Sequence, residues 1–312
     1  MNNEKPRVSI GMAVFNGEKY IEETLDSILA QTYRDFELII SDNASTDRTQ
    51  EICQTYAAKD RRIRYSRNSK NLGAAPNYNR TVELARGQYF KWADHDDLLG
   101  PDFIAKCIEV LDQHPEAVLC FPRVSVINEY GTVLGDHKYK SDTSSLQPQV
   151  RFRNLVLNPD TGYEVSGLMR VSAMRQTGLI ASFPASDLVF LAELALHGQF
   201  IELTETLFFP RYHPHQSTKG ELTVERDRVV FFDTSNAGKI LLPKWLYLFG
   251  YLWAINNAPL SGAQRLYCYF QMVRWCLKPD HFRALGKDVL LALNKLLVRT
   301  FIKPKAKTQQ TV

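Results

Sequence analysis

The first half of the chain alternates apolar runs with segments of helical periodicity. Four apolar runs have the length of buried strands: 8–15, 36–41, 63–66 and 88–93. Between them, apolar residues recur at helical spacing in three segments: 20–29, 46–58 and 75–85. Alternating strands and helices are typical of a parallel sheet with helices on its faces. We therefore expect an α/β fold.

The pattern is less regular in the second part of the chain. Pro101 suits the first position of a further helix. Strands are expected at 118–128, 132–134, 165–170, 200–203 and 207–212, a polar loop at 138–145 and a helix at 187–197. From about residue 221 only helical patterns follow. This change predicts two parts, an α/β domain over 1–220 and a helical extension over 221–312.

Composition limits the class of protein. With 312 residues, 45% of them hydrophobic and 23% charged, the chain can bury a large core. Its five cysteines are an odd number without a CxxC pair, which favours neither a disulfide framework nor a zinc site. The apolar run at 8–15 suits a core strand better than a secretion signal. We expect a cytoplasmic protein.

Charge is distributed unevenly along the chain. Residues 237–312 contain twelve Lys or Arg and two acids, although the net charge of the whole chain is only +4. A nucleic-acid-binding domain carries its basic face on the folded core, so we expect no nucleic acid as partner. The most apolar window of this basic end, 245–255, is too short to span a bilayer as a helix.

Three polar loops follow predicted strands, at 16–18, 42–47 and 94–97. Ligands of open α/β sheets bind at the carboxyl ends of the strands, where such loops gather. The acids of the second and third loops would repel one another unless a cation offsets them, and Mg²⁺ or Mn²⁺ suits their oxygen ligands. The alternative is that these acids cap helices, and each loop alone favours it. Four consecutive side chains, Asp94, His95, Asp96 and Asp97, exceed what one cap needs.

The chain resembles the family 2 glycosyltransferases, which have the GT-A fold. The resemblance covers about 7–219 and rests on motifs in the family's order: VSIGMAVFNGEKYIEETLDSILAQTY, FELIISDNASTDRT, NSKNLGAAPNYN, GQYFKWADHDD, ASDLVFLAELALHG and PRYHPHQS. It implies a metal-dependent transferase that uses a nucleotide-sugar donor and inverts the sugar's configuration.

The resemblance also implies roles for individual residues. The donor nucleotide would be bound by Ala13, Phe15, Asn16, Glu18, Asp42, Asn71, Gly73, Asp94 and Asp96. Within the DxD motif, Asp94 would face the ribose and Asp96 the metal. The second motif departs from the family's pair of acids followed by glycine, but its first acid, Asp42, is retained.

Acceptor-side roles follow from the later motifs. Where the family has a Glu-Asp pair, the chain has Ser186 and Asp187, so Asp187 is the candidate catalytic base. A helix N-cap is the structural alternative for Asp187, and the two roles are compatible. His213 is a candidate metal or diphosphate ligand, with a surface loop histidine as an equal alternative. Gly167 and Arg170 are expected beside the acceptor.

The basic end contains a segment with one apolar helical face. That face is formed by Phe282, Leu285, Val289, Leu293, Leu296 and Leu297. A basic amphipathic helix can lie in a membrane interface, so an anionic membrane surface is a candidate partner and the protein would be peripheral on the inner face. Packing on the catalytic domain is the alternative. It has at least equal weight for 245–275, so membrane contact is favoured only for the last helix.

Taken together, the sequence predicts transfer of a sugar, from a UDP-sugar as first expectation, to a saccharide or lipid-linked saccharide. A nucleotidyltransferase of related fold is an alternative, but it calls for a glycine-rich basic loop where the chain has Phe15-Asn16-Gly17-Glu18. The same loop lacks the GxGxxG of a dehydrogenase. A non-catalytic scaffold is the third alternative, although all four key aspartates are present.

Overall fold

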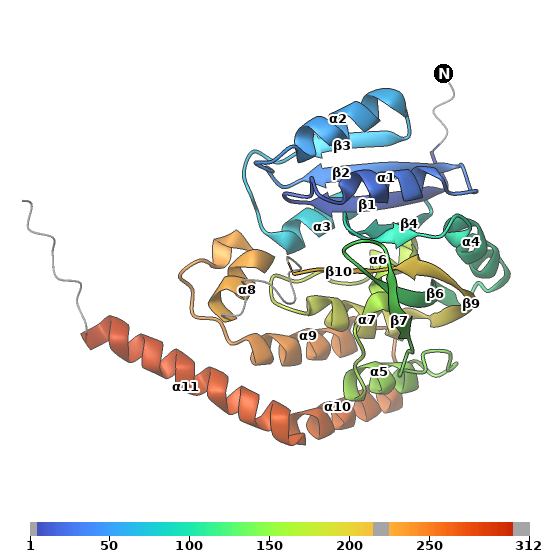
Figure 1. The fold of residues 1–312 in the computed structure, drawn as a ribbon. Coiled ribbons are helices and arrows are strands. Elements are labelled where there is room, and N and C mark those ends of the chain that lie inside the picture. The colour runs from blue at the N-terminus through green and yellow to red at the C-terminus, as the bar shows by residue number, and fades with distance from the viewer. Residues whose placement is uncertain (1–4, 215–224, 302–312) are drawn as a thin grey trace, which may run out of the picture.

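The computed structural model describes residues 5–214 and 225–301, and a mixed sheet of ten strands forms its centre (Figure 1). The strands are β1 (Val8–Val14), β2 (Phe36–Asp42), β3 (Ile63–Arg67), β4 (Tyr89–Ala93), β5 (Leu98–Leu99), β6 (Ala117–Asn128), β7 (Val133–His137), β8 (Leu168–Arg170), β9 (Gln199–Phe209) and β10 (Arg211–Tyr212). Their order is β3-β2-β1-β4-β8-β6-β9-β5, with β7 and β10 pairing with β6. The predicted α/β class is confirmed.

Helices surround the sheet and then extend beyond it. They are α1 (Ile21–Leu29), α2 (Thr49–Lys59), α3 (Ala74–Glu83), α4 (Phe103–Gln113), α5 (Pro148–Leu157), α6 (Val171–Met174), α7 (Ser186–His197), α8 (Glu225–Phe232), α9 (Pro243–Asn257), α10 (Gly262–Leu277) and α11 (Pro279–Phe301). Two 3₁₀ turns, η1 (Tyr163–Ser166) and η2 (Thr234–Asn236), complete the described elements.

The first four strands run parallel, so their carboxyl ends share one edge of the sheet. β1 pairs in parallel with β2, where Val14 lies opposite Asp42, and with β4, where Met12 lies opposite Ala93. The loops that follow β1, β2 and β4 therefore emerge side by side. These are the three polar loops that the sequence singled out.

Alternating side chains place a separate core on each face of the sheet. Ile10 and Met12 of β1 pack with apolar residues of α1, α2 and α4 on one face. Phe90 and Trp92 of β4 point to the other face, where they pack with residues of α3, α5 and α7. Successive side chains of β4 point to opposite faces of the sheet, so this strand contributes residues to both cores.

The helical extension shares the second of these cores. Tyr251 of α9 and Trp275 of α10 are buried in the same cluster as Phe152 of α5 and Phe190 of α7. Figure 1 shows α9 beside α7, α10 below α5, and α11 running away from the body. The predicted boundary at 220/221 lies outside the described residues, so the division into 1–220 and 221–312 stays a prediction.

Several expected elements differ in the structure. The sequence analysis did not predict α5, whose apolar positions are interrupted by Arg151, a buried residue that donates to the carbonyl of Ala195. The two strands expected at 200–203 and 207–212 form one long strand, β9, followed by β10. The strand expected at 165–170 is only β8, because residues 163–166 form η1. Pro101 precedes α4, which begins at Phe103.

Candidate functional site

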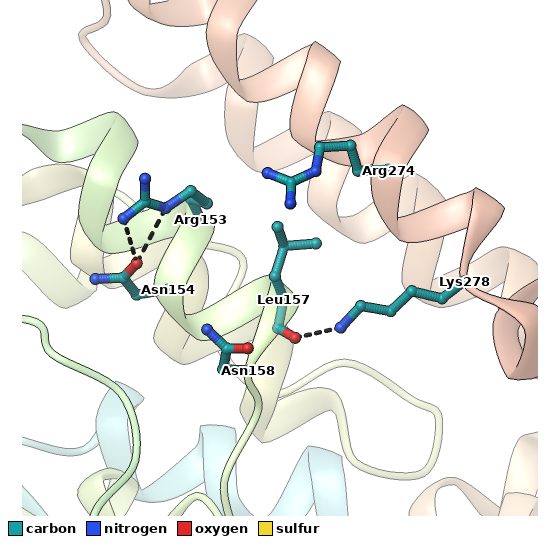
Figure 2. Close-up of a pocket in the computed structure, with 6 residues that line it drawn as sticks. All are labelled: Arg153, Asn154, Leu157, Asn158, Arg274 and Lys278. Atoms are coloured by element: carbon teal, nitrogen blue, oxygen red, sulfur yellow. Dashed lines mark hydrogen bonds between the residues drawn. The ribbon is translucent and has the colours of Figure 1, made fainter.

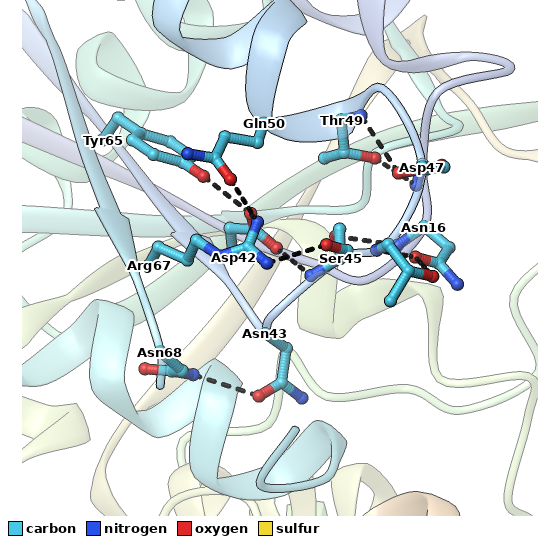
Figure 3. Close-up of polar contacts among 12 residues, drawn as sticks. Asn16, Asp42, Asn43, Ser45, Asp47, Thr49, Gln50, Tyr65, Arg67 and Asn68 are labelled. Atoms are coloured by element: carbon cyan, nitrogen blue, oxygen red, sulfur yellow. Dashed lines mark hydrogen bonds and ion pairs between the residues drawn. The ribbon is translucent and has the colours of Figure 1, made fainter. Parts of the chain in front are cut away.

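Asp42 is the last residue of β2 and is fully buried, and both of its carboxylate oxygens accept hydrogen bonds (Figure 3). One carboxylate oxygen accepts the amide of Ser45 at 2.8 Å. The other accepts the hydroxyl of Tyr65 at 2.6 Å and the guanidinium of Arg67 at 3.2 Å. The carboxylate is therefore held rigidly at the strand end where a nucleotide base was expected.

The loop after β1 is cross-linked to the loop after β2. Asn16 has a positive φ of 53°, and its side-chain oxygen accepts the amide of Thr46 at 2.8 Å. Glu18 accepts the amide of Arg48 at 2.9 Å, so its carboxylate stabilises the start of α2. Ala13 is buried near the end of β1, whereas Phe15 is 40% exposed. The five predicted residues of these two loops thus lie together.

A network of asparagine amides fixes the loop that contains Asn71 and Gly73. Asn43 donates to the side chain of Asn71 at 2.9 Å and to the carbonyl of Gly73 at 3.0 Å. Its oxygen accepts from Asn68, which also donates to Asn77 of α3. These side chains satisfy buried backbone groups, and this structural role explains why the NSKNLGAAPNYN motif is rich in asparagine.

The acidic cluster follows β4, as predicted, and its three carboxylates are in different environments. Burial and the charge of Asp96 raise the pKa of Asp94, against a hydrogen bond from the hydroxyl of Tyr78. Burial and the charges of Asp96 and Asp94 raise the pKa of Asp97 well above its usual range. Burial also opposes ionisation of Asp96, but a hydrogen bond from His213 and nearby histidine charge hold its pKa below the usual value.

Basic groups from distant parts of the chain surround this cluster. His213 Nε2 lies 2.9 Å from Asp96 Oδ2. Arg211, whose side chain is fully buried, donates its amide to Asp97 at 2.8 Å and its guanidinium to the carbonyl of Asp96 and to Glu23. The ammonium of Lys91 is buried behind the cluster, and burial lowers its pKa to about 8.

Sequence reasoning missed three of these neighbours: Tyr78, Lys91 and Arg211. Arg211 lies in the PRYH motif, of which only the histidine, His213, was predicted as a site residue. Lys91 was treated as part of an apolar strand, although it donates to the backbone carbonyls of Trp92 and Ser166. A lysine within a buried run was the signal that could have identified it.

His95, the middle residue of the DxD, turns toward the loop after β1. A Cβ added to Gly17 would lie 2.6 Å from the His95 ring, so the two groups are in direct contact. The glycine therefore allows the acidic loop and the loop after β1 to pack closely. This contact brings the loop after β1, with its predicted donor-binding residues, next to the loop that contains Asp94 and Asp96.

Asp187 occupies the first turn of α7, after Ala185 with a positive φ of 55°. Burial and, to a smaller extent, the charge of Asp94 raise the pKa of Asp187 to about 6, against hydrogen bonds from backbone amides at the helix start. Phe190, one turn further along α7, packs on Trp92 of β4 with ring centroids 5.2 Å apart, which brings the start of α7 toward the strand that leads into the acidic cluster. The N-cap alternative for Asp187 is wrong, because Ala185 precedes α7 and no side chain caps the start of this helix. The role of Asp187 as a site carboxylate stays a prediction.

The two residues expected beside the acceptor, Gly167 and Arg170, contact backbone groups of the protein core. Arg170 pairs with Tyr89 at the start of β4, the end away from the acidic cluster, and donates to the carbonyls of Leu111, His114 and Ala117. At Gly167 an added Cβ would lie 2.7 Å from the carbonyl of Cys120, so this glycine permits close packing. The structure does not bring Arg170 to the site.

A segment after α8 covers the donor loop. The amide of Thr234 donates to the carbonyl of Leu72 at 3.2 Å, and its hydroxyl donates to the carbonyl of Asn71 at 3.1 Å. Asn236 donates to the carbonyl of Ser182, which lies in the loop before α7. Residues 233–236 thus bridge the loop of Asn71 and Gly73 to the loop that leads to Asp187.

Within the described parts of the chain, no group of three or more His, Cys, Asp or Glu side chains is arranged to hold a metal ion. The chemistry of the acidic cluster nevertheless fits one. Carboxylate oxygens are the ligands that Mg²⁺ and Mn²⁺ prefer, and Mg²⁺ sites commonly combine one or two carboxylates with substrate phosphates. Burial, together with repulsion among the neighbouring carboxylates, raises the pKa values of Asp94 and Asp97, and a bound cation would offset that repulsion.

Known proteins resemble this chain in sequence and in fold. Residues 9–175 match the family model of Glycosyl transferase family 2. An uncharacterized glycosyltransferase of Methanocaldococcus jannaschii is 36% identical over 137 residues, which are 43% of this chain and 47% of that protein. TuaG of Bacillus subtilis, whose name refers to teichuronic acid biosynthesis, is 36% identical over 134 residues, 43% of this chain and 53% of that one. The chain thus matches about half the length of these curated relatives.

The fold has a solved counterpart. The crystal structure of S. aureus TarS 1-349 superimposes with a TM-score of 0.63 at 18% identity, covering 93% of this chain and 82% of that one. This likeness confirms the predicted GT-A fold. Because the family model spans more than half of the 312 residues, from β1 to α6, the chain belongs to Glycosyl transferase family 2.

Proposed function

We propose that this protein is an inverting glycosyltransferase that moves a sugar from a nucleoside-diphosphate donor to a hydroxyl of a saccharide or lipid-linked saccharide. One observation carries the proposal. Phe190 of α7 packs on Trp92 of β4 with ring centroids 5.2 Å apart, so the start of α7, which contains Asp187, lies near the end of β4 that leads into the acidic cluster. A carboxylate whose pKa burial raises to about 6 is suited to act as base toward a donor whose diphosphate a cation on that cluster would bind.

The donor side is assigned to the loops after β1, β2 and β4. Asp42 and the loop of Asn16 would receive the base, the loop of Asn71 and Gly73 would lie along the donor, and Asp94 would face the ribose. Asp96 and His213 would hold a divalent cation, Mn²⁺ or Mg²⁺, together with the diphosphate. When bound, that cation neutralises the charge that develops on the leaving diphosphate.

Asp187 is assigned the proton transfer. Its carboxylate takes the proton of the acceptor hydroxyl while that oxygen forms a bond to the anomeric carbon. The bond from this carbon to the diphosphate oxygen breaks on the opposite face, which inverts the configuration and releases the nucleoside diphosphate. With a pKa of about 6, Asp187 is ionised at neutral pH yet basic enough to accept the proton.

UDP is the nucleotide we expect first. S. aureus TarS, which shares the fold, was crystallised in complex with UDP and with UDP-GlcNAc. The name of TuaG suggests polysaccharide assembly as the setting. No helix in 5–214 or 225–301 is long and apolar enough to cross a bilayer. We propose a cytoplasmic enzyme that meets the inner membrane face through α11, with no nucleic acid as partner.

Calorimetric titration tests the donor half of this proposal. The protein is titrated with UDP, GDP and dTDP, with and without Mn²⁺, together with an Asp96→Ala variant. We expect one nucleotide to bind only when the metal is present and Asp96→Ala to abolish this binding. The matched control is Asp136→Ala, which removes an exposed aspartate of β7 and should bind as the unmodified chain does. Absence of binding by all three nucleotides would refute the proposal.

A further inference from the structure

Helix α10 presents apolar side chains on two opposite faces. Cys268, Met272 and Trp275 are buried in the core shared with α5 and α7. The outer face contains Leu266, Phe270, Val273 and Leu277, which are 70%, 59%, 54% and 68% exposed. Their spacing of four, three and four residues aligns them in one continuous stripe along the helix. We call these four residues the α10 stripe.

A basic pocket lies beside this stripe, between α5 and α10 (Figure 2). Its volume is about 390 Å³, and its lining residues are Arg153, Asn154, Leu157, Asn158, Arg274 and Lys278. Three of the six are cations and none is an acid. Arg274 and Lys278 directly follow Val273 and Leu277 of the stripe in the sequence.

The hydrogen bonds of these three cations involve only neutral groups. Arg153 donates to the side chains of Asn154 and Tyr267, Arg274 donates to Gln271, and Lys278 donates to the carbonyl of Leu157. Across the described part of the chain, none of the three pairs with a carboxylate. The pocket therefore carries a net positive charge that an anionic group would complement.

Helix α11 continues the same chemistry. Phe282, Leu290 and Leu293 are more than half exposed, and Arg283 and Lys287 lie on the same helix. Figure 1 shows α10 and α11 consecutively along the lower edge of the molecule, with α9 and α5 between them and the sheet. Exposed apolar residues with neighbouring cations therefore extend over both helices.

We propose that the α10 stripe and the basic pocket dock this protein on the surface of an anionic lipid bilayer. The stripe would enter the boundary between headgroups and acyl chains, as apolar faces of interfacial helices do. Arg153, Arg274 and Lys278 would receive lipid phosphate groups. The proposal adds α10, which packs on the catalytic core, to the membrane contact already proposed for α11. Membrane docking by α10 does not depend on transfer activity.

Charge favours a bilayer over a second copy of the chain. A symmetric dimer that buried the stripe would bring Arg274 and Lys278 of both copies to one interface, where like charges repel. An anionic bilayer buries the stripe and compensates the same cations. Attraction to a negatively charged membrane surface amounts to about a fivefold gain in affinity for each basic residue near it.

Vesicle flotation of the full chain tests the proposal. We expect the protein to float with vesicles of equal parts phosphatidylcholine and phosphatidylglycerol and to stay behind with phosphatidylcholine alone. A stripe variant, Leu266→Ser with Phe270→Ser and Leu277→Ser, should lose tenfold or more in affinity, since each buried apolar side chain contributes on the order of tenfold. A pocket variant, Arg153→Gln with Arg274→Gln, should lose about 25-fold, at fivefold for each charge.

Matched controls use equally exposed residues elsewhere. Val133→Ser with Leu134→Ser changes two 58% exposed residues of β7, and Arg48→Gln removes an exposed cation before α2. Both should float as the unmodified chain does. Thermal unfolding and nucleotide titration of every variant report whether fold and donor site are intact, so failure of the donor proposal would be seen separately.

Three outcomes would overturn the inference. One is equal flotation with neutral and anionic vesicles, and another is unchanged flotation of the stripe or pocket variant. The third is a dimer in sedimentation analysis that the stripe variant converts to a monomer, which would assign the stripe to a second copy.

Discussion

Asp187 is the residue on which the proposed chemistry depends most. An Asp187→Asn variant keeps the size of the side chain but cannot accept the proton, so we expect transfer to fall by about 10²–10⁴-fold while nucleotide binding is retained. The measurement is release of the nucleoside diphosphate from the donor identified by calorimetry. Glu193→Gln, further along α7, is the control, because burial also raises the pKa of Glu193 to about 7. Equal losses in both variants would contradict the assignment.

The same residue predicts how stability varies with pH. The pKa of Asp187 is raised by folding, so its carboxyl favours the folded state below about pH 4, and this contribution is lost as pH rises through 6. Asp187→Asn should match the unmodified chain near pH 4 and exceed it above pH 7, by up to about 3 kcal/mol. Urea unfolding at both pH values measures this difference. A variant less stable at high pH would show that ionised Asp187 stabilises the fold.

Arg211 is expected to be the cation most important for stability. Its buried guanidinium donates to the carbonyls of Asp96 and Glu129 and to Glu23, whose side chain is 61% exposed, so Arg211→Ala should cost about 1–3 kcal/mol in the free energy of unfolding, mainly because the carbonyls lose their donor. Arg123→Ala removes the partner of Glu202 in an exposed pair and should cost less than about 1 kcal/mol. Urea unfolding compares the two variants, and similar costs would argue against a structural role for the buried cation.

The sequence alone was enough to select candidate site residues, but it did not reveal which side chains and carbonyls surround them. Asp94, Asp96, Asp187 and His213 could be selected because ordered motifs identify positions along the chain. Arg170 could not be placed, because a strand of three residues gives no register from sequence. Its guanidinium donates to the carbonyls of Leu111 near the end of α4 and Ala117 at the start of β6, which are far away in the sequence. Long-range partners of this kind depend on tertiary packing, which no local pattern reports.

Among the elements, the segment after α8 has the most direct effect on the donor loop. Gly73 has a φ of +96°, and an added Cβ would lie 2.6 Å from the Cα of Asp233. Gly73→Ala should therefore displace residues 233–236 and weaken nucleotide binding as well as stability. Gly131→Ala is a matched control, since Gly131 also has a positive φ, of +80°, but has nothing within 4 Å of the added atom.

The comparison separates backbone strain from collision. Both variants carry the cost of a side chain at positive φ, about 1–3 kcal/mol. Only Gly73→Ala should also lower nucleotide affinity in calorimetry. If Gly131→Ala lowers it equally, contact between the η2 segment and the donor loop has no part in binding.

Helices and strands with a regular apolar pattern were predicted correctly, and those with polar residues inside the pattern were not. β1, β2 and β4 were predicted within about two residues, because buried parallel strands are continuous apolar runs bounded by polar loops. Helix α5 was missed because a buried arginine lies on its apolar face. The split of β9 into two predicted strands reflects polar residues such as Thr204 and Glu205, which lie where the pairing of β9 with β6 is irregular, between the pairs Glu202–Phe121 and Thr206–Arg123.

The whole molecule depends on packing between the α/β part and the helical extension. Within the extension, Tyr251, Ile255, Cys268, Met272 and Trp275 are nearly fully buried against α5 and α7. Burial of each stabilises the fold by about 1.5–3 kcal/mol. Together they approach the entire stability of a typical domain, about 5–15 kcal/mol. The extension therefore completes the core that supports α7 and Asp187.

We therefore predict that a chain ending at residue 220 does not fold cooperatively, although every motif of the resemblance lies within it. Its α5 and α7 would expose the apolar surface that α9 and α10 cover. Circular dichroism with urea unfolding makes the comparison, and a chain ending at Phe301 is the control, because it retains α9, α10 and α11. Cooperative unfolding of the 1–220 chain with unchanged nucleotide binding would instead show two independent domains, and the core shared across α7 and α9 would then be a docking interface between them.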